Sequence, residues 1–174
     1  VVGALGRSGR GACEVARACG VTSLAEWDLA ETKAGGPFAA MCDVDVLVNC
    51  IYLTTKIEPF VTTDMVRAAG RRLRTFVDVS ADTTNPLSPV PFYSSATTLA
   101  APVLRLDCGA HADVLDVIAI DHLPTLLPVE STESFAADLV PHIIDGLAAD
   151  KPQSSVIERA HALFVDKTAP LREK

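Results

Sequence analysis

The sequence is short of basic residues and of long apolar runs. Lys and Arg number 15 against 22 Asp and Glu, which gives the 174-residue chain a formal net charge of −7. This balance argues against a nucleic-acid-binding protein, because binding to phosphates requires a basic surface. No apolar run approaches the ~18 residues that a membrane span requires. We therefore expect no nucleic-acid partner and no membrane association.

The cysteines are irregularly spaced. The five cysteines include no C-x-x-C pair, which argues against a disulfide framework and against a zinc site. We expect reduced thiols, no metal ion and a cytoplasmic location. The first residue is not methionine, and only Val1 and Val2 precede a glycine-rich turn. From this we expect that the chain begins inside its first strand and is a piece of a longer protein.

Apolar residues are abundant, at 49% of the chain against 21% charged residues, which is typical of a folded globular protein. Strand-like and helix-like segments alternate along the chain. This alternation predicts an α/β fold, a Rossmann-like, doubly wound, mostly parallel sheet with helices on both faces. We expect residues 1–174 to form one domain. The expected strands are 24–28, 44–52, 73–80 and 114–121, and the expected helices are 9–19, 63–69, 135–147 and 156–166.

A glycine-rich turn follows the first strand and opens the first helix. Gly3, Gly6 and Gly9 give the pattern G-x-x-G-x-x-G. Glycine allows a positive φ in such a turn and lets backbone N–H groups approach a diphosphate, which the helix N-terminus also attracts. The pattern therefore predicts a dinucleotide-binding turn. An ordinary tight turn is the alternative, because a glycine-rich stretch alone is weak evidence.

An acidic residue at the end of the second expected strand strengthens the prediction. Asp28 lies 19 residues after Gly9, where a carboxylate can accept hydrogen bonds from both ribose hydroxyls and repel a 2′-phosphate. This favours NAD over NADP as the cofactor. Arg7 could bind a 2′-phosphate instead, although we favour a position over the adenine or the diphosphate.

Other candidates follow the expected strands, because ligands of open α/β sheets bind outside the carboxyl ends of strands. Tyr52 could line the cofactor site or be a rim aromatic, and Val79 could pack on the cofactor or, more simply, belong to the core. Asp121 and His122 pair an acid with a residue that titrates near neutral pH. They could serve the chemistry, or Asp121 could stabilise a turn before Pro124.

Several longer strings resemble one protein family. They run in order along essentially the whole chain, and the longest is compositionally unusual: GALGR at 3–7, WD at 27–28, ET at 31–32, GGPF at 35–38, NCIYL at 49–53, PF at 59–60, RRLR at 71–74, VDVSADTTNP at 77–86 and IDHLPTLLP at 120–128. Together with the glycine turn, they are similar to the NAD-dependent, L-lysine-forming saccharopine dehydrogenases.

The resemblance implies an oxidoreductase that oxidatively cleaves saccharopine, with NAD and water, to L-lysine and 2-oxoglutarate in lysine biosynthesis. It also implies two Rossmann-like domains, of which this chain is the second and binds NAD. The family's lysine and histidine acid–base pair belongs to the first domain, so no catalytic acid or base is assigned here. Residues 151–174, a C-terminal helix, are expected to dock on that first domain, through which saccharopine, lysine and 2-oxoglutarate are bound.

The resemblance also implies cofactor contacts. Gly6 and Arg7 would contact the phosphates, and Thr32 would lie beside Asp28 at the adenosine ribose. Tyr52 and Val79 would flank the cofactor. The group near the nicotinamide would be Ile120, Asp121, His122 and Leu123, with Asp121 the best candidate for touching the substrate.

Two other functions fit a Rossmann-like chain. One is a non-catalytic regulatory or assembly module. The other is a methyltransferase that binds S-adenosylmethionine, which the triple glycine turn and Arg7 fit less well.

Overall fold

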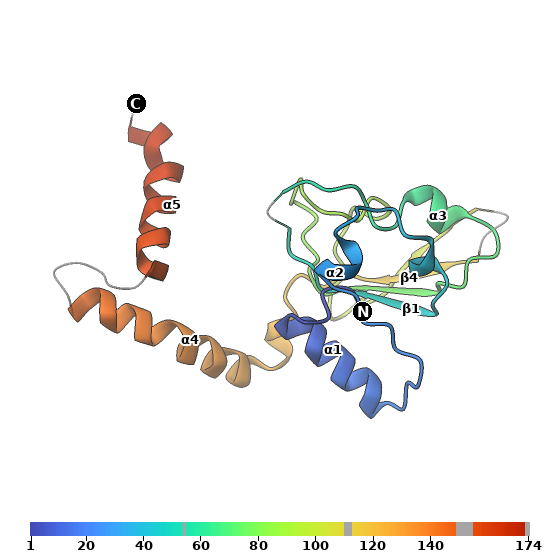
Figure 1. Cartoon of the computed structure of the whole chain (residues 1–174), viewed down its shortest axis with the longest axis horizontal. Coiled ribbons are helices and arrows are strands. Elements are labelled where there is room, and N and C mark those ends of the chain that lie inside the picture. Colours follow the sequence, from blue (N-terminus) through green and yellow to red (C-terminus); the bar gives the residue numbers. More distant parts are fainter. Residues whose placement is uncertain (54, 110–112, 149–154, 173–174) are drawn as a thin grey trace. The chain divides into compact units, whose positions relative to one another are not determined.

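The computed structural model describes residues 1–53, 55–109, 113–148 and 155–172 (Figure 1). The chain forms two compact units, Val1–Leu123 and Pro124–Lys174. Of the predicted C-terminal segment 151–174, residues 151–154 and 173–174 lie outside the described residues.

The first unit contains a four-stranded sheet in the order β1-β2-β4-β3. Strands β1, β2 and β4 are parallel, and β3 is antiparallel to β4 at the edge. This confirms the predicted α/β fold with a mostly parallel sheet; the edge strand β3 was not predicted. The bounds are β1 Val46–Asn49, β2 Thr75–Asp78, β3 Leu104–Leu106 and β4 Leu115–Ile118.

Two isolated bridges extend the sheet beyond β1. Val2 pairs in parallel with Asn49 of β1 on one side and with Trp27 on the other. The expected strand 24–28 is thus reduced to one bridge. Along the sheet, the order of segments is Trp27, Val2, β1, β2 and β4. The chain therefore reverses its direction of winding at Val2, and in such sheets this reversal marks the crevice where ligands bind.

The three parallel strands are apolar because the sheet is covered on both sides. Figure 1 shows α1 on one side of the sheet and the short helices α2 and α3 on the other. α3 begins after Thr62, which caps the helix because its hydroxyl accepts a hydrogen bond from the N–H of Met65 (3.2 Å). The helical elements of the unit are α1 Arg7–Ala18, α2 Leu29–Thr32, the 3-10 helix η1 Ala39–Cys42 and α3 Thr63–Arg67.

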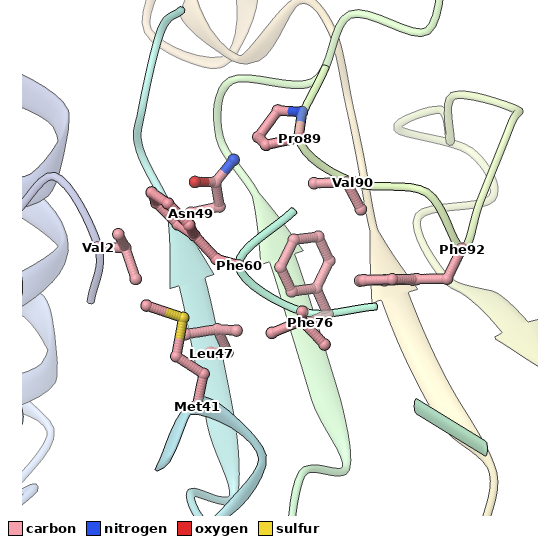
Figure 2. A pocket seen from close by; sticks show the side chains of 10 residues that line it. Val2, Met41, Leu47, Asn49, Phe60, Phe76, Pro89, Val90 and Phe92 are labelled. Carbon is pink, nitrogen blue, oxygen red and sulfur yellow. The ribbon is translucent and has the colours of Figure 1, made fainter. Parts of the chain in front are cut away.

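One side of the sheet carries a narrow apolar pocket (Figure 2). Asn49 is the one polar side chain among the ten that line it. The apolar lining residues are Val2, Met41, Leu47, Phe60, Val61, Phe76, Pro89, Val90 and Phe92. An amide in such surroundings is stable only if it is hydrogen-bonded, and Asn49 has its partner on the next strand.

The second unit is helical. The 3-10 helix η2 Leu123–Leu126 leads into α4 Pro128–Ala148, and α5 Ser155–Arg172 follows. α4 and α5 contact each other, and α4 begins seven residues before the predicted start at 135. Among the described helices, none is both long and apolar enough to cross a membrane.

Candidate functional site

The glycine turn is built by close backbone contacts. Gly3 has a φ of 80°, and its N–H donates to the carbonyl of Trp27 at 2.8 Å. A Cβ at Gly9 would lie 2.0 Å from the Gly3 carbonyl oxygen, and one at Gly3 would lie 3.0 Å from the carbonyl oxygen of Cys50. Only glycine allows α1, the turn and the end of β1 to approach this closely.

The N-terminus of α1 opens directly from this turn. Gly6 is the N-cap residue with φ −72°, and as a glycine it has no side chain with which to cap the helix. Gly6 and Arg7 are exposed. The first N–H groups of a helix carry a partial positive charge and are good donors to an anion. The turn thus presents backbone donors, with a cationic side chain at the first helical position.

Asp28 is tied to the glycine turn. Its Oδ2 accepts a hydrogen bond from the N–H of Leu5, within the turn, at 2.8 Å. Its Oδ1 accepts one from the N–H of Leu29, also at 2.8 Å. These two backbone bonds hold the pKa of Asp28 below its usual range. Each carboxylate oxygen has a further lone pair, so the half-buried, ionised group can still accept hydrogen bonds from a ligand.

A capping box orients Asp28. The Asp28 side chain caps α2, while Glu31 Oε2 accepts a hydrogen bond from the Asp28 N–H at 2.7 Å. The buried Thr32 donates its hydroxyl proton to the Asp28 carbonyl oxygen at 2.8 Å. Thr32 therefore supports the backbone of Asp28. Its predicted contact with a cofactor stays a prediction.

The remaining candidates follow the carboxyl ends of β1, β2 and β4. They therefore lie at the same end of the parallel strands as the glycine turn. Tyr52 is 78% exposed. Val79 is half-buried, and its N–H donates to the Asn49 carbonyl at 2.9 Å. Tyr52 lies two residues beyond Cys50, whose carbonyl group is close to Gly3. Tyr52 follows β1, the strand next to Val2, whereas Val79 follows β2, one strand farther from the glycine turn.

The third group follows β4. Ile120 is buried and forms a parallel bridge with Thr97, so it belongs to the sheet. Asp121 Oδ1 and His122 Nδ1 are 2.5 Å apart, and both side chains are substantially exposed. Leu123 is half-buried at the start of η2. The Asp121 carboxylate and the His122 imidazole thus form a hydrogen-bonded pair.

Several residues near the carboxyl ends of the strands were not predicted from the sequence. The D-x-x-E spacing of Asp28 and Glu31 was a readable capping-box signal. The backbone donor at Leu5 left no signal, because any residue supplies an N–H. A group formed by the buried Asn49 and Asp78 and the half-buried Tyr93 was also missed. Among the described residues, no group of three or more His, Cys, Asp or Glu could hold a metal ion.

Curated fungal proteins are similar to this chain over nearly its whole length. A Neurospora crassa protein named "Saccharopine dehydrogenase [NAD(+), L-lysine-forming]" is 45% identical over 175 aligned positions, which cover 99% of this chain and 46% of that protein. The chain is thus similar to the saccharopine dehydrogenases. Proteins of the same name from Yarrowia lipolytica and Emericella nidulans are 45% and 44% identical, over 94% and 98% of this chain.

The chain spans less than half the length of these saccharopine dehydrogenases, 44% of the Yarrowia lipolytica protein and 46% of the other two. No family model matches the chain.

Proposed function

We propose that this chain is the NAD-binding domain of a saccharopine dehydrogenase that forms L-lysine. The parent enzyme would cleave saccharopine oxidatively, with NAD as cofactor, to L-lysine and 2-oxoglutarate. One observation carries the proposal: the carboxylate of Asp28 and the N-terminus of α1 are joined by the Leu5 N–H, so a ribose acceptor and a diphosphate donor set lie side by side. The names of the relatives support the same cofactor.

The residues present fit a dinucleotide. A side chain at Gly9 would collide with the turn, and Gly6 has no side chain that could occupy the backbone donors of the first turn of α1. We assign the diphosphate to these donors and to Arg7. Asp28 would accept the hydroxyls of the adenosine ribose, and its negative charge would repel a 2′-phosphate, which favours NAD over NADP.

The sheet order sets the direction of the cofactor. Asp28 lies on one side of Val2, and β1, β2 and β4 lie on the other. A ligand whose ribose is held by Asp28 and whose diphosphate is held by α1 would then extend toward the ends of β1 and β2. Tyr52 and Val79 would flank it there, and the segment 120–123 would lie farther along.

Bound NAD would supply a hydride acceptor to the parent enzyme. In this chain, Asp121 is our candidate for a residue near the substrate, with His122 as its hydrogen-bonded neighbour. We assign neither residue as the catalytic acid or base. The five free thiols support the further proposal that the protein works in the reducing cytoplasm.

Titration with NADH tests the proposal. Trp27 is the single tryptophan, and its carbonyl accepts hydrogen bonds from Gly3 and Ala4, so its fluorescence should respond to a ligand at the turn. We expect saturable quenching by NADH, weakened in Asp28→Ala together with a smaller preference for NADH over NADPH. Asp45→Ala is the matched control, because Asp45 is an exposed acid that pairs with Arg72.

The outcomes separate the functions. No saturable response at millimolar NADH would contradict cofactor binding and favour the non-catalytic module. Unchanged nucleotide preference in Asp28→Ala would mean that the carboxylate only caps α2. Quenching by S-adenosylmethionine but not by NADH would indicate the methyltransferase.

A further inference from the structure

Two neighbouring strands end in the same kind of turn. At the end of β1, the Asn49 Oδ1 accepts a hydrogen bond from the N–H of Ile51 at 3.4 Å. At the end of β2, the Asp78 Oδ1 accepts one from the N–H of Ser80 at 3.1 Å. Both bonds join residue i to residue i+2, the geometry by which Asn and Asp side chains redirect a chain. The side chains therefore hold the first residues of the two loops.

The two turns are joined to each other. Asn49 and Asp78 are register partners in the parallel pair β1–β2, and the Asn49 Nδ2 donates to the Asp78 Oδ1 at 3.0 Å. Tyr93 donates its hydroxyl proton to the Asp78 Oδ2 at 2.7 Å. The Tyr93 ring packs near Phe76 and Phe92, so its position is set by the core. We name the side chains of Asn49, Asp78 and Tyr93 the Asp78 network.

Burial of the Asp78 carboxylate is energetically unfavourable. Asp78 is 2% exposed, and burial raises the pKa of its carboxyl group, although the three donors favour the charged form. A buried carboxylate is weak evidence for stability, because an apolar residue of similar volume often stabilises a core as well or better. The network is therefore better explained by the shape that it imposes on the two loops than by a contribution to folding.

These loops carry two of the proposed cofactor contacts. Tyr52 follows Ile51, and Val79 lies between Asp78 and Ser80. We propose that Asp78 is a positioning residue, which through Asn49 and Tyr93 fixes the loops after β1 and β2 so that Tyr52 and Val79 meet the nicotinamide half of the cofactor. This inference rests on the proposed function. Asp28 and α1 hold the other half, so the network should affect NADH and leave ADP binding unchanged.

The test compares two nucleotides and two levels of disruption in the full 174-residue chain. ADP carries only the adenosine and diphosphate parts, whereas NADH also carries the nicotinamide half. The first variant is Asp78→Ala. The second is Tyr93→Phe, which removes one hydroxyl and keeps the ring, so it can be used if Asp78→Ala fails to fold. Asp78→Asn is the conservative rescue, because its amide can accept from Asn49 and donate to the tyrosine oxygen. The control is Asp116→Asn, which alters the ion pair between Asp116 in β4 and Arg105 in β3.

We expect the dissociation constant for NADH to rise about tenfold in Asp78→Ala and about threefold in Tyr93→Phe, as for the loss of buried hydrogen bonds. The constant for ADP should change by less than about twofold, and Asp78→Asn should recover most of the NADH affinity. Equal weakening of NADH and ADP would overturn the positioning role, since general destabilisation affects both. Unchanged NADH binding in every folded variant would overturn it as well.

Amide hydrogen exchange without nucleotide separates this inference from the proposed function. Exchange at Ile51 and Ser80 should accelerate in Asp78→Ala or Tyr93→Phe and stay unchanged in Asp116→Asn. Unchanged exchange at both amides would show that the network does not hold the loops. If the unmodified chain binds neither nucleotide while exchange accelerates as expected, the proposed function and the cofactor role of Asp78 fail together, and only the loop-holding network remains.

Discussion

Replacement of Gly9 by alanine should be the most damaging single-methyl change in the glycine turn. The added Cβ would lie 2.0 Å from the Gly3 oxygen, 2.7 Å from the Gly3 carbonyl carbon and 2.8 Å from the Ala4 Cα. All three atoms are backbone, so relief requires α1 to move away from the turn. Overpacking of this kind costs about 1–3 kcal/mol, and contacts this short place Gly9→Ala near the upper end.

Gly11→Ala is the matched control. Gly11 lies in the same helix, and its added Cβ would meet nothing within 4 Å apart from the chain neighbours and the nearby backbone of α1 itself. Alanine is the better helix former, so this variant should be more stable than the unmodified chain by about 0.5–1 kcal/mol. The same propensity gain applies at position 9. The difference between the two variants therefore isolates the steric cost.

Urea unfolding and NADH titration measure the two consequences. Gly9→Ala should unfold at lower urea than Gly11→Ala, with a difference in the free energy of unfolding of about 1–3 kcal/mol. Its NADH affinity should fall about tenfold or more, because the diphosphate donors move with α1. Equal stability and equal affinity of the two variants would refute the account of the turn.

Two further predictions concern buried and titrating groups. Arg71 is buried and donates hydrogen bonds to three backbone carbonyls and to the Cys108 thiol. Arg71→Ala should therefore lower the free energy of unfolding by about 2 kcal/mol or more. The control is Arg72→Ala, which removes an exposed ion pair and should change the urea midpoint of unfolding little. Asp28 and Asp78 should have opposite pH effects, measured as unfolding free energies of their Asn variants between pH 2 and 7. Hydrogen bonds lower the Asp28 pKa, so its contribution is present above the unfolded value of 3.8 and is lost as the pH falls through the folded pKa. Burial raises the Asp78 pKa, so stability relative to Asp78→Asn is lost as the pH rises through the folded pKa. Parallel pH curves for the two variants would contradict these assignments.

The local parts of the fold and site were predictable from sequence. The helix-like segments 9–19 and 63–69 located α1 and α3. The strand-like segments 44–52, 73–80 and 114–121 located β1, β2 and β4. The spacing of the glycines predicted a dinucleotide-binding turn at the start of α1. The structure shows a closely packed turn there, with Gly9 against Gly3, and cofactor binding by it stays a prediction. These signals are readable because each depends on residues close together in the chain.

The missed features depend on contacts between distant residues. The bond between Asn49 and Asp78 joins residues 29 positions apart, and it exists only in the observed register of β1 and β2. Tyr93 lies in a proline-rich stretch without periodicity, so nothing in the sequence placed its hydroxyl on Asp78. The short strand β3 pairs with β4 in antiparallel fashion, and three residues are too few to give an alternating pattern.

Backbone amide shifts during NADH titration would locate the place where a dinucleotide binds. We predict saturable shifts concentrated at Gly6, Arg7 and Leu29, with smaller shifts near Tyr52 and Val79. Saturable shifts confined to other parts of the chain would contradict the claim that the α1 N-terminus and Asp28 hold the cofactor, as would no shift at millimolar NADH.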